Sequence, residues 1–193
     1  MTFDESILSS SPGSDTGSLA VDELIDEIIT VHHLLLREDV LRIDRIVRDM
    51  TEHGSTGEST LMEIQQLVQG LAACVESQLT TEERLVFPML RRLQHQTQIT
   101  KCRAGMIQSR VMVIEREFAR IRGIMLRLQD LAQEYASPNG PCELCHELLR
   151  AARDLLSHLI KHSHRELGIL YPWAVARERE LAATTAAAED KPS

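Results

Sequence analysis

The sequence predicts an all-α protein, an up-down-up-down four-helix bundle, from its composition and its hydrophobic pattern. Of 193 residues, 43% are hydrophobic but only 3% are aromatic, and Leu, Glu, Arg, Ala and Gln dominate. Sandwiches and barrels instead draw on β-branched and aromatic residues. Four long segments carry apolar residues at steps of three and four, and three short joints separate them. A chain of this length suits one domain, and short joints favour the up-down order.

The first two helices are predicted on either side of a Gly-containing break at 53–57 (HGSTG). The first runs from Val21 to about Met50, and its apolar face is expected to comprise Leu24, Ile28, Val31, Leu35, Ile43 and Val47. The second runs from Glu58 to about Arg92. Pro88 is expected to bend or interrupt it near its end, because proline disrupts the helical hydrogen-bond pattern.

The last two helices are predicted on either side of SPNGP at 137–141, a strong stop signal. The third runs from Gly105 to Tyr135, with an inward face of Val111, Ile114, Phe118, Ile121, Met125 and Leu128. The fourth runs from Cys142 to about Leu170 and meets Pro172 near its end. The bundle is therefore expected over residues 20–176, between a disordered arm at 1–19 and a helix end with a flexible tail at 177–193.

Charge and composition disfavour several classes of partner and location. Lys and Arg number 21 against 29 Asp and Glu, a formal charge of -8, and no basic block stands out. A nucleic-acid groove or an anionic membrane surface usually needs such a block, so we expect no nucleic acid and no membrane as partner. The first residues lack a signal-peptide pattern, and no apolar run is long enough to span a bilayer. A cytoplasmic protein with free thiols is therefore expected.

The most informative feature is a repeat at the ends of the second and fourth predicted helices. Each copy has a His or Gln, a glutamate four residues later, and an aromatic-proline pair at five and six residues after the glutamate. The copies are Gln78, Glu82, Phe87 and Pro88, and His162, Glu166, Tyr171 and Pro172. Residues four apart share a helix face, and in a bundle such pairs from facing helices can converge on a metal. A lone pair of this kind is more often an exposed helix pairing, but here Leu155, Leu159 and Leu170 surround it.

Several motifs together resemble a known family. They are HHLLLRE at 32–38, His53-Gly54, EERLVFP at 82–88, and the His162 to Pro172 copy of the repeat. In this order they resemble hemerythrin-like (HHE cation-binding) domains, over about residues 24–174. They are most similar to the di-iron repair of iron centres family, whose members are linked to iron-sulfur cluster repair under nitrosative or oxidative stress.

The resemblance implies specific ligands. It places histidine ligands at His33 and His162, bridging carboxylates at Glu82 and Glu166, and a nearby histidine at His53. Two further family histidines are missing, because Gln78 and Phe118 stand in their positions. Since each of those histidines holds one of the two irons, each iron site has lost a nitrogen ligand.

The remaining donors suit a mononuclear or weakened di-iron site, and the same set would accept manganese or zinc. Further candidate ligands are Gln78, His158, His53 and Glu115. The resemblance implies iron-sulfur centre repair, or sensing or handling of nitric oxide, oxygen or peroxide, with a diatomic ligand or an iron-sulfur protein as partner. A homo-oligomer is compatible with the sequence. No proton-transfer pair is evident, so enzyme activity stays open.

A metal-free bundle that acts as a regulatory or partner-binding module is the alternative. Phe118 favours it, because a phenyl ring would fill the volume that a ligand and metal otherwise occupy. Against it, two histidines and two carboxylates in an apolar core without a metal would be costly unless they are solvated or hydrogen-bonded to one another.

CELCH at 142–146 matches the pattern of c-type haem attachment. Haem is not expected, because covalent attachment requires an exported chain. Cys142 and Cys145 are alternatively redox thiols at a helix N-terminus, where the helix dipole lowers the pKa of a thiol. Two ordinary cysteines at the start of the fourth helix are the simplest interpretation.

Overall fold

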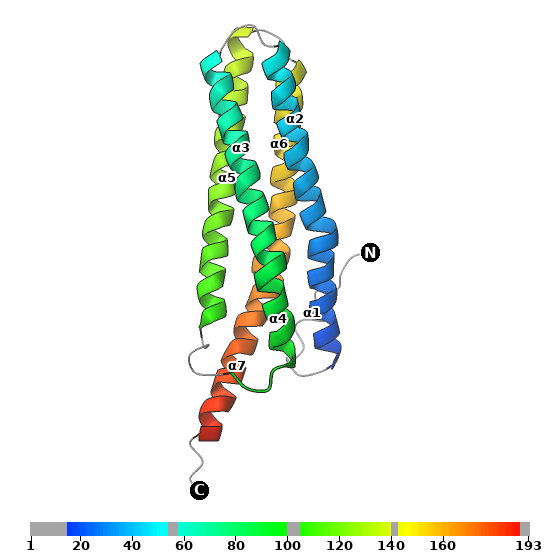
Figure 1. Ribbon diagram of the computed structural model, residues 1–193, viewed down its shortest axis with the longest axis vertical. Helices are drawn as coiled ribbons and strands as arrows, with labels where there is room; N and C mark the ends of the chain where they lie inside the picture. The colour runs from blue at the N-terminus through cyan, green and yellow to red at the C-terminus, as the bar shows by residue number, and fades with distance from the viewer. Residues whose placement is uncertain (1–14, 54–57, 100–104, 140–142, 190–193) are drawn as a thin grey trace. The chain divides into compact units, whose positions relative to one another are not determined.

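The computed structural model describes residues 15–53, 58–99, 105–139 and 143–189, and these residues form an all-α helical bundle (Figure 1). Four long helices are present, as the sequence predicts. Three of them contain a short π-helical segment, in which the hydrogen bonds span five residues instead of four. No strand occurs within the described ranges, and none of their helices has the length and apolar character needed to cross a membrane.

The first long helix consists of α1 (Asp15–Glu27), the π-helix η2 (Ile28–His33) and α2 (Leu34–His53). The second consists of α3 (Glu58–Thr81), the π-helix η3 (Glu82–Val86) and α4 (Phe87–His95). The third is α5 (Met106–Asn139). The fourth consists of α6 (Glu143–Ser163), the π-helix η5 (His164–Leu170) and α7 (Tyr171–Glu189).

The helices extend beyond several predicted ends. The first begins at Asp15, inside the segment predicted as a disordered arm, and the rest of that arm lies outside the described residues. Helix α5 continues to Asn139, into the SPNGP stop. The fourth helix passes Pro172 and reaches Glu189 rather than ending near Leu170. Proline is tolerated there because it directly follows the π-helical turn η5, which widens the helix before it.

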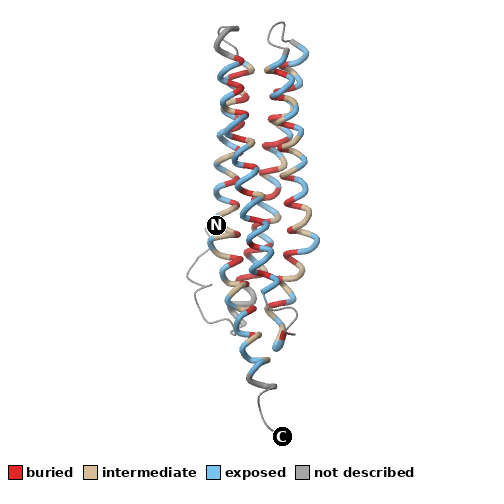
Figure 2. The backbone as a smooth tube through the Cα atoms, turned by 90° about the vertical axis from the view of Figure 1, so that its left-hand side faces the viewer, coloured by how far each residue is buried: buried red, intermediate tan, exposed pale blue. Residues whose placement is uncertain are grey.

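The chain divides into two compact units whose boundaries fall inside the long helices. Unit 1 comprises residues 1–30, 80–116 and 162–193, and unit 2 comprises residues 31–79 and 117–161. In both, buried residues recur at steps of three and four along each helix (Figure 2). The predicted inward face of the third helix is confirmed, because all six of its residues are buried.

The predicted face of the first helix is only partly correct. Leu24, Ile28 and Ile43 are fully buried, but Val31 is 46% exposed. A π-helical turn adds one residue to the helix and so rotates everything after it by roughly 100°. As a result His32, His33 and Leu36 become buried, in place of Val31 and Leu35.

Unit 2 is held by an aliphatic core and by ion pairs at its surface. Its fully buried side chains include Ile43, Ile64, Leu71, Ile121, Leu128 and Leu155. Three arginine-carboxylate pairs link its helices: Arg37 with Glu76 at 2.9 Å, Arg42 with Asp154 at 3.1 Å, and Arg127 with Glu63 at 2.8 Å. These pairs place α2 beside α3 and α6, and α3 beside α5.

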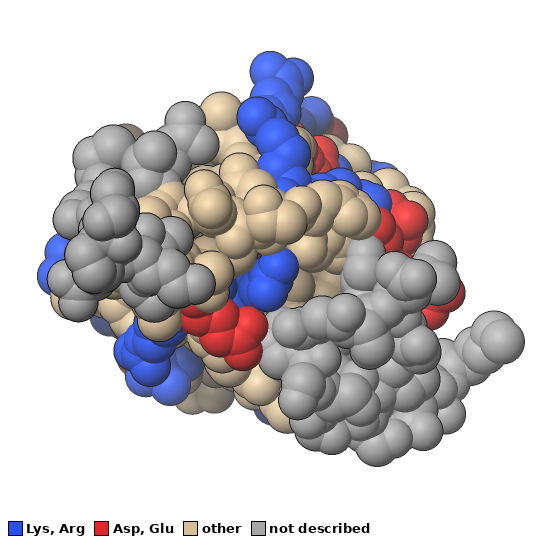
Figure 3. Space-filling view, turned by 90° about the horizontal axis from the view of Figure 1, so that it is seen from below, with Lys and Arg blue, Asp and Glu red and all other residues tan. Residues whose placement is uncertain are grey.

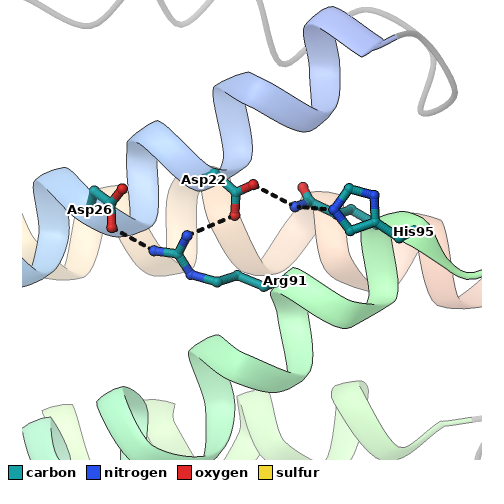
Figure 4. Close-up of polar contacts among 5 residues, drawn as sticks. Asp22, Asp26, Arg91 and His95 are labelled. Carbon is teal, nitrogen blue, oxygen red and sulfur yellow. Dashed lines mark hydrogen bonds and ion pairs between the residues drawn. The ribbon is translucent and has the colours of Figure 1, made fainter.

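In unit 1, α1 packs against α4 and η5, and α4 also packs against α7. Arg91 of α4 donates to the carboxylates of Asp22 at 2.9 Å and Asp26 at 2.6 Å, both on α1 (Figure 4). Gln94 donates to the other oxygen of Asp22 at 2.8 Å. Seen from below, basic and acidic side chains are interspersed with uncharged ones (Figure 3). Arg91 thus links the first and second long helices within this unit.

Replacement of Arg91 by methionine should lower the free energy of unfolding by about 0.5 to 1 kcal/mol, because its carboxylate partners are partly exposed. Chemical denaturation at low and high salt measures this, and the difference from wild type should shrink at high salt. Arg92→Met is the matched control, since among the described residues the Arg92 side chain bonds the Pro88 carbonyl of its own helix and no carboxylate. An equal loss of stability in both variants would contradict this role for Arg91.

Candidate metal centre

The predicted ligands lie at the π-helical turns. His33 is the last residue of η2, Glu82 is the first residue of η3, and Glu166 lies within η5. His162 lies in α6, two residues before η5 begins. Such turns are rare within α-helices and often occur at functional sites. The π-helical turns thus lie at or beside Glu82, His162 and Glu166, which belong to the sequence repeat, and at His33, which the family resemblance adds.

The repeated aromatic-proline pair explains two of these turns. The Phe87 N–H donates to the Glu82 carbonyl, and the Tyr171 N–H donates to the Glu166 carbonyl, so each bond spans five residues. The proline that follows has no N–H to donate, and in a regular α-helix its ring would clash with the carbonyl four residues earlier. A wider turn before the proline relieves this clash.

The first helix reaches its π-helical turn without a proline. There the Thr30 hydroxyl donates to the Asp26 carbonyl at 2.6 Å. Such a bond from side chain to backbone competes with the regular helical pattern and often bends a helix.

Four buried side chains form the candidate centre. His33, Glu82, His162 and Glu166 each offer one ligand atom, and these atoms all lie within 4.8 Å of one another. Exposure of the four residues is 0%, 1%, 0% and 0% in that order. The structure therefore brings together the two histidines and two glutamates that the sequence singles out.

The distances around His162 fit ligands of a common metal ion better than hydrogen bonds. Its Nε2 atom lies 3.6 Å from Glu166 Oε1 and 3.9 Å from Glu82 Oε2. A nitrogen-oxygen hydrogen bond is usually shorter than about 3.2 Å. Two atoms that each lie about 2.1 Å from one metal ion are themselves roughly 3.0 to 4.2 Å apart, depending on the angle between them.

The burial of the Glu166 carboxylate and the negative charge near it also favour a cation bound at this centre. Neither of its carboxylate oxygens has a hydrogen-bond partner of normal geometry among the described residues. Burial raises the pKa of Glu166 well above its usual value, and the nearby Glu82 carboxylate raises it further, while Tyr171 opposes the shift. Two carboxylates this close and this buried repel each other, and a cation between them would remove that cost.

Tyr171 completes the surroundings of Glu166. It is 1% exposed, and a hydrogen bond between its hydroxyl and the Glu166 carboxylate lowers the pKa of Glu166. Burial raises the pKa of the Tyr171 phenol well above its usual value, and the carboxylates of Glu166 and Glu82 raise it further. The phenol is therefore neutral next to the two carboxylates.

Two additional candidate ligands do not belong to this group. His158 is half-buried, and its Nδ1 atom lies 2.5 Å from Asp39 Oδ2, so it pairs with α2 instead. Glu115 is exposed. The sequence could not separate His158 from His162, because both lie on the same face of one helix.

The other candidates remain predictions. Gln78 and Phe118, at the positions of the missing family histidines, are both 7% exposed. His53 ends α2, but its side chain lies outside the described residues.

The prediction of free thiols is wrong for one cysteine. Cys145 is fully buried and disulfide-bonded, and its partner lies outside the described residues, as does Cys142. Cys74 is free and half-buried. Composition alone could not reveal this, because four cysteines do not say which two meet.

The fold and the buried donor group together define a metal-binding helical-bundle protein. Residues 24–174 match the family model of the hemerythrin HHE cation binding domain. The chain belongs to the hemerythrin family. No curated protein matches the chain.

Proposed function

We propose that the protein binds one iron ion through His33, Glu82, His162 and Glu166. The observation that carries this proposal is the closeness of four buried ligand atoms, all within 4.8 Å of one another. Imidazole nitrogens and carboxylate oxygens suit ferrous iron, and also manganese and zinc. The two carboxylates would balance the charge of a divalent ion, which accounts for buried charges that would otherwise destabilise the core.

A single ion is favoured over a pair by the residues at two positions. Gln78 and Phe118 stand where the resemblance expects histidines, and a phenyl ring cannot bind a metal. Two ions would have to share only two histidines and two carboxylates. One ion can use all four donors.

We further propose that this iron handles or senses a small ligand, namely nitric oxide, oxygen or peroxide. When bound, the iron would supply open coordination positions and a change of oxidation state. The chain itself keeps bulk water from the donors, because His33, Glu82, His162 and Glu166 are each at most 1% exposed. Resemblance to the repair of iron centres family adds iron-sulfur centre repair under stress, with an iron-sulfur protein as partner.

Exposure of the ferrous protein to nitric oxide tests this role. The electron paramagnetic resonance spectrum should gain a signal from nitric oxide bound to non-haem iron, and zinc-loaded protein should show none. An iron-loaded protein whose spectrum does not respond would contradict the role in small-ligand handling while leaving metal binding intact. A protein that takes up no metal would instead support the regulatory or partner-binding alternative.

A further inference from the structure

Unit 1 contains a cavity that the candidate metal centre does not use. Its volume is about 280 Å³, and none of the four proposed metal ligands lines it. Side chains from three helices line it, namely Met89, Arg92 and Leu93 of α4, Met106 and Ile107 of α5, and Glu178 of α7. Sites for drug-sized molecules measure roughly 300 to 1,000 Å³, so this cavity suits a smaller molecule.

Hydrogen bonds to α7 fix one wall of the cavity. This wall is the segment that follows α4, and it contributes Gln96 and Ile99 to the lining. Arg177 donates to the Gln96 carbonyl at 2.8 Å, and the Ile99 N–H donates to the Thr185 hydroxyl at 3.3 Å. The cavity is therefore preformed, as sites for small ligands usually are.

Glu178 places a buried carboxylate in this cavity. It is 3% exposed, and its Oε1 atom accepts a hydrogen bond from the Ile107 N–H at 3.1 Å. This bond caps the first turn of α5 and accounts for one of the two oxygens. Among the described residues, no cation forms an ion pair with the carboxylate and no donor bonds its Oε2 atom. A buried carboxylate without a counter-ion destabilises the fold, so Oε2 is the place for a cation from a ligand.

Arg92 supplies the opposite charge in the same cavity. Its Nε atom donates to the Pro88 carbonyl at 3.0 Å, which leaves its terminal amino groups without a carboxylate among the described residues. Arg92 and Glu178 both line the cavity, yet they do not pair with each other. Met89 and Met106 add flexible thioether side chains, which adapt to apolar groups of different shape. The cavity thus offers an anion, a cation and an apolar surface.

We propose that this cavity binds a zwitterion with an apolar side chain, namely a free amino acid such as leucine. The ammonium group of the ligand pairs with Glu178, its carboxylate pairs with Arg92, and its side chain packs against Leu93 and Ile107. A ligand with both charges satisfies both unpaired groups at once, whereas a simple acid or amine satisfies only one. This site does not depend on the proposed metal centre.

Isothermal titration calorimetry of the full chain with four ligands tests this proposal. L-Leucine should bind with a Kd below about 1 mM. Of the other three ligands, 4-methylpentanoate lacks the ammonium group, 3-methylbutylamine lacks the carboxylate, and glycine lacks the apolar side chain. Each should bind at least about tenfold more weakly than L-leucine, because it leaves a charged group unpaired or the apolar surface uncovered.

Two variants assign the charged contacts. Glu178→Gln should bind L-leucine at least about tenfold more weakly but 4-methylpentanoate as wild type does, and its amide oxygen can still accept from the Ile107 N–H. Arg92→Gln should likewise lose affinity for L-leucine and keep its affinity for 3-methylbutylamine. Glu180→Gln and Arg120→Gln are the matched controls and should bind as wild type does, since both residues are exposed and neither lines the cavity.

The comparison of ligands on wild-type protein decides the inference even where a variant does not fold. Absence of L-leucine binding at about 10 mM, or similar affinities for L-leucine and glycine, would overturn it. Wild-type affinity for L-leucine in a folded Glu178→Gln or Arg92→Gln variant would also overturn it.

Discussion

Replacement of His162 by alanine is expected to abolish metal binding. The Nε2 atom of His162 lies within 3.9 Å of an oxygen from each of the two glutamates, Glu82 and Glu166. Loss of one of two nitrogen ligands leaves a donor set that holds ferrous iron poorly. Affinity should fall by more than about 100-fold, which exceeds the usual effect of removing a residue that only supports a ligand. Anaerobic titration with ferrous iron and elemental analysis after desalting measure the loss.

Two histidines on the same helix are controls for this variant. His146 is exposed, so His146→Ala should bind iron as wild type does. His158 pairs with Asp39, so His158→Ala should also retain the metal, even where it lowers stability. Full metal occupancy in His162→Ala, or a loss of metal in His158→Ala, would contradict the assigned ligands.

The metal-free protein is expected to lose stability as the pH rises. Burial raises the pKa of Glu166 in the folded state, so the folded protein binds more protons than the unfolded chain between the usual and the raised pKa. The contribution of Glu166 to the free energy of unfolding is complete below the usual pKa of a glutamate. This contribution is lost as the pH rises towards the raised pKa of the folded state. One proton contributes at most about 1.4 kcal/mol per pH unit. Urea denaturation of chelator-treated protein between about pH 5.5 and about pH 7.5 measures the slope.

Glu166→Gln separates this contribution from those of the groups that face it, which are Glu82, His162 and Tyr171. The amide has no proton to lose, so the stability of the variant should depend less on pH, whereas Glu180→Gln should behave as wild type because Glu180 is exposed. Saturating ferrous iron should reverse the trend in wild type, since the ion binds the ionised carboxylate. A Glu166→Gln variant with the wild-type slope would refute this account of the pH dependence.

Most of the fold follows from the spacing of apolar residues. The inward face of the third helix is correct at every position from Val111 to Leu128, because α5 is a regular helix without a π-helical turn. The face of the first helix is wrong at Val31, because an inserted residue shifts the register and apolar spacing assumes a constant period. Helix ends were less predictable, since Pro172 lies inside a continuous helix.

The core of the candidate site could also be predicted from the sequence. The repeat marked Glu82, His162 and Glu166, and the structure groups them with His33. The π-helical turns were not predicted. Their signal was the proline of each repeated aromatic-proline pair, because a proline has no N–H to donate and favours a wider turn before it.

Elemental analysis of protein purified after iron-supplemented expression tests the central claim most directly. The four buried donors predict about one iron per chain, retained through desalting. A folded protein that contains no metal would contradict the proposed centre.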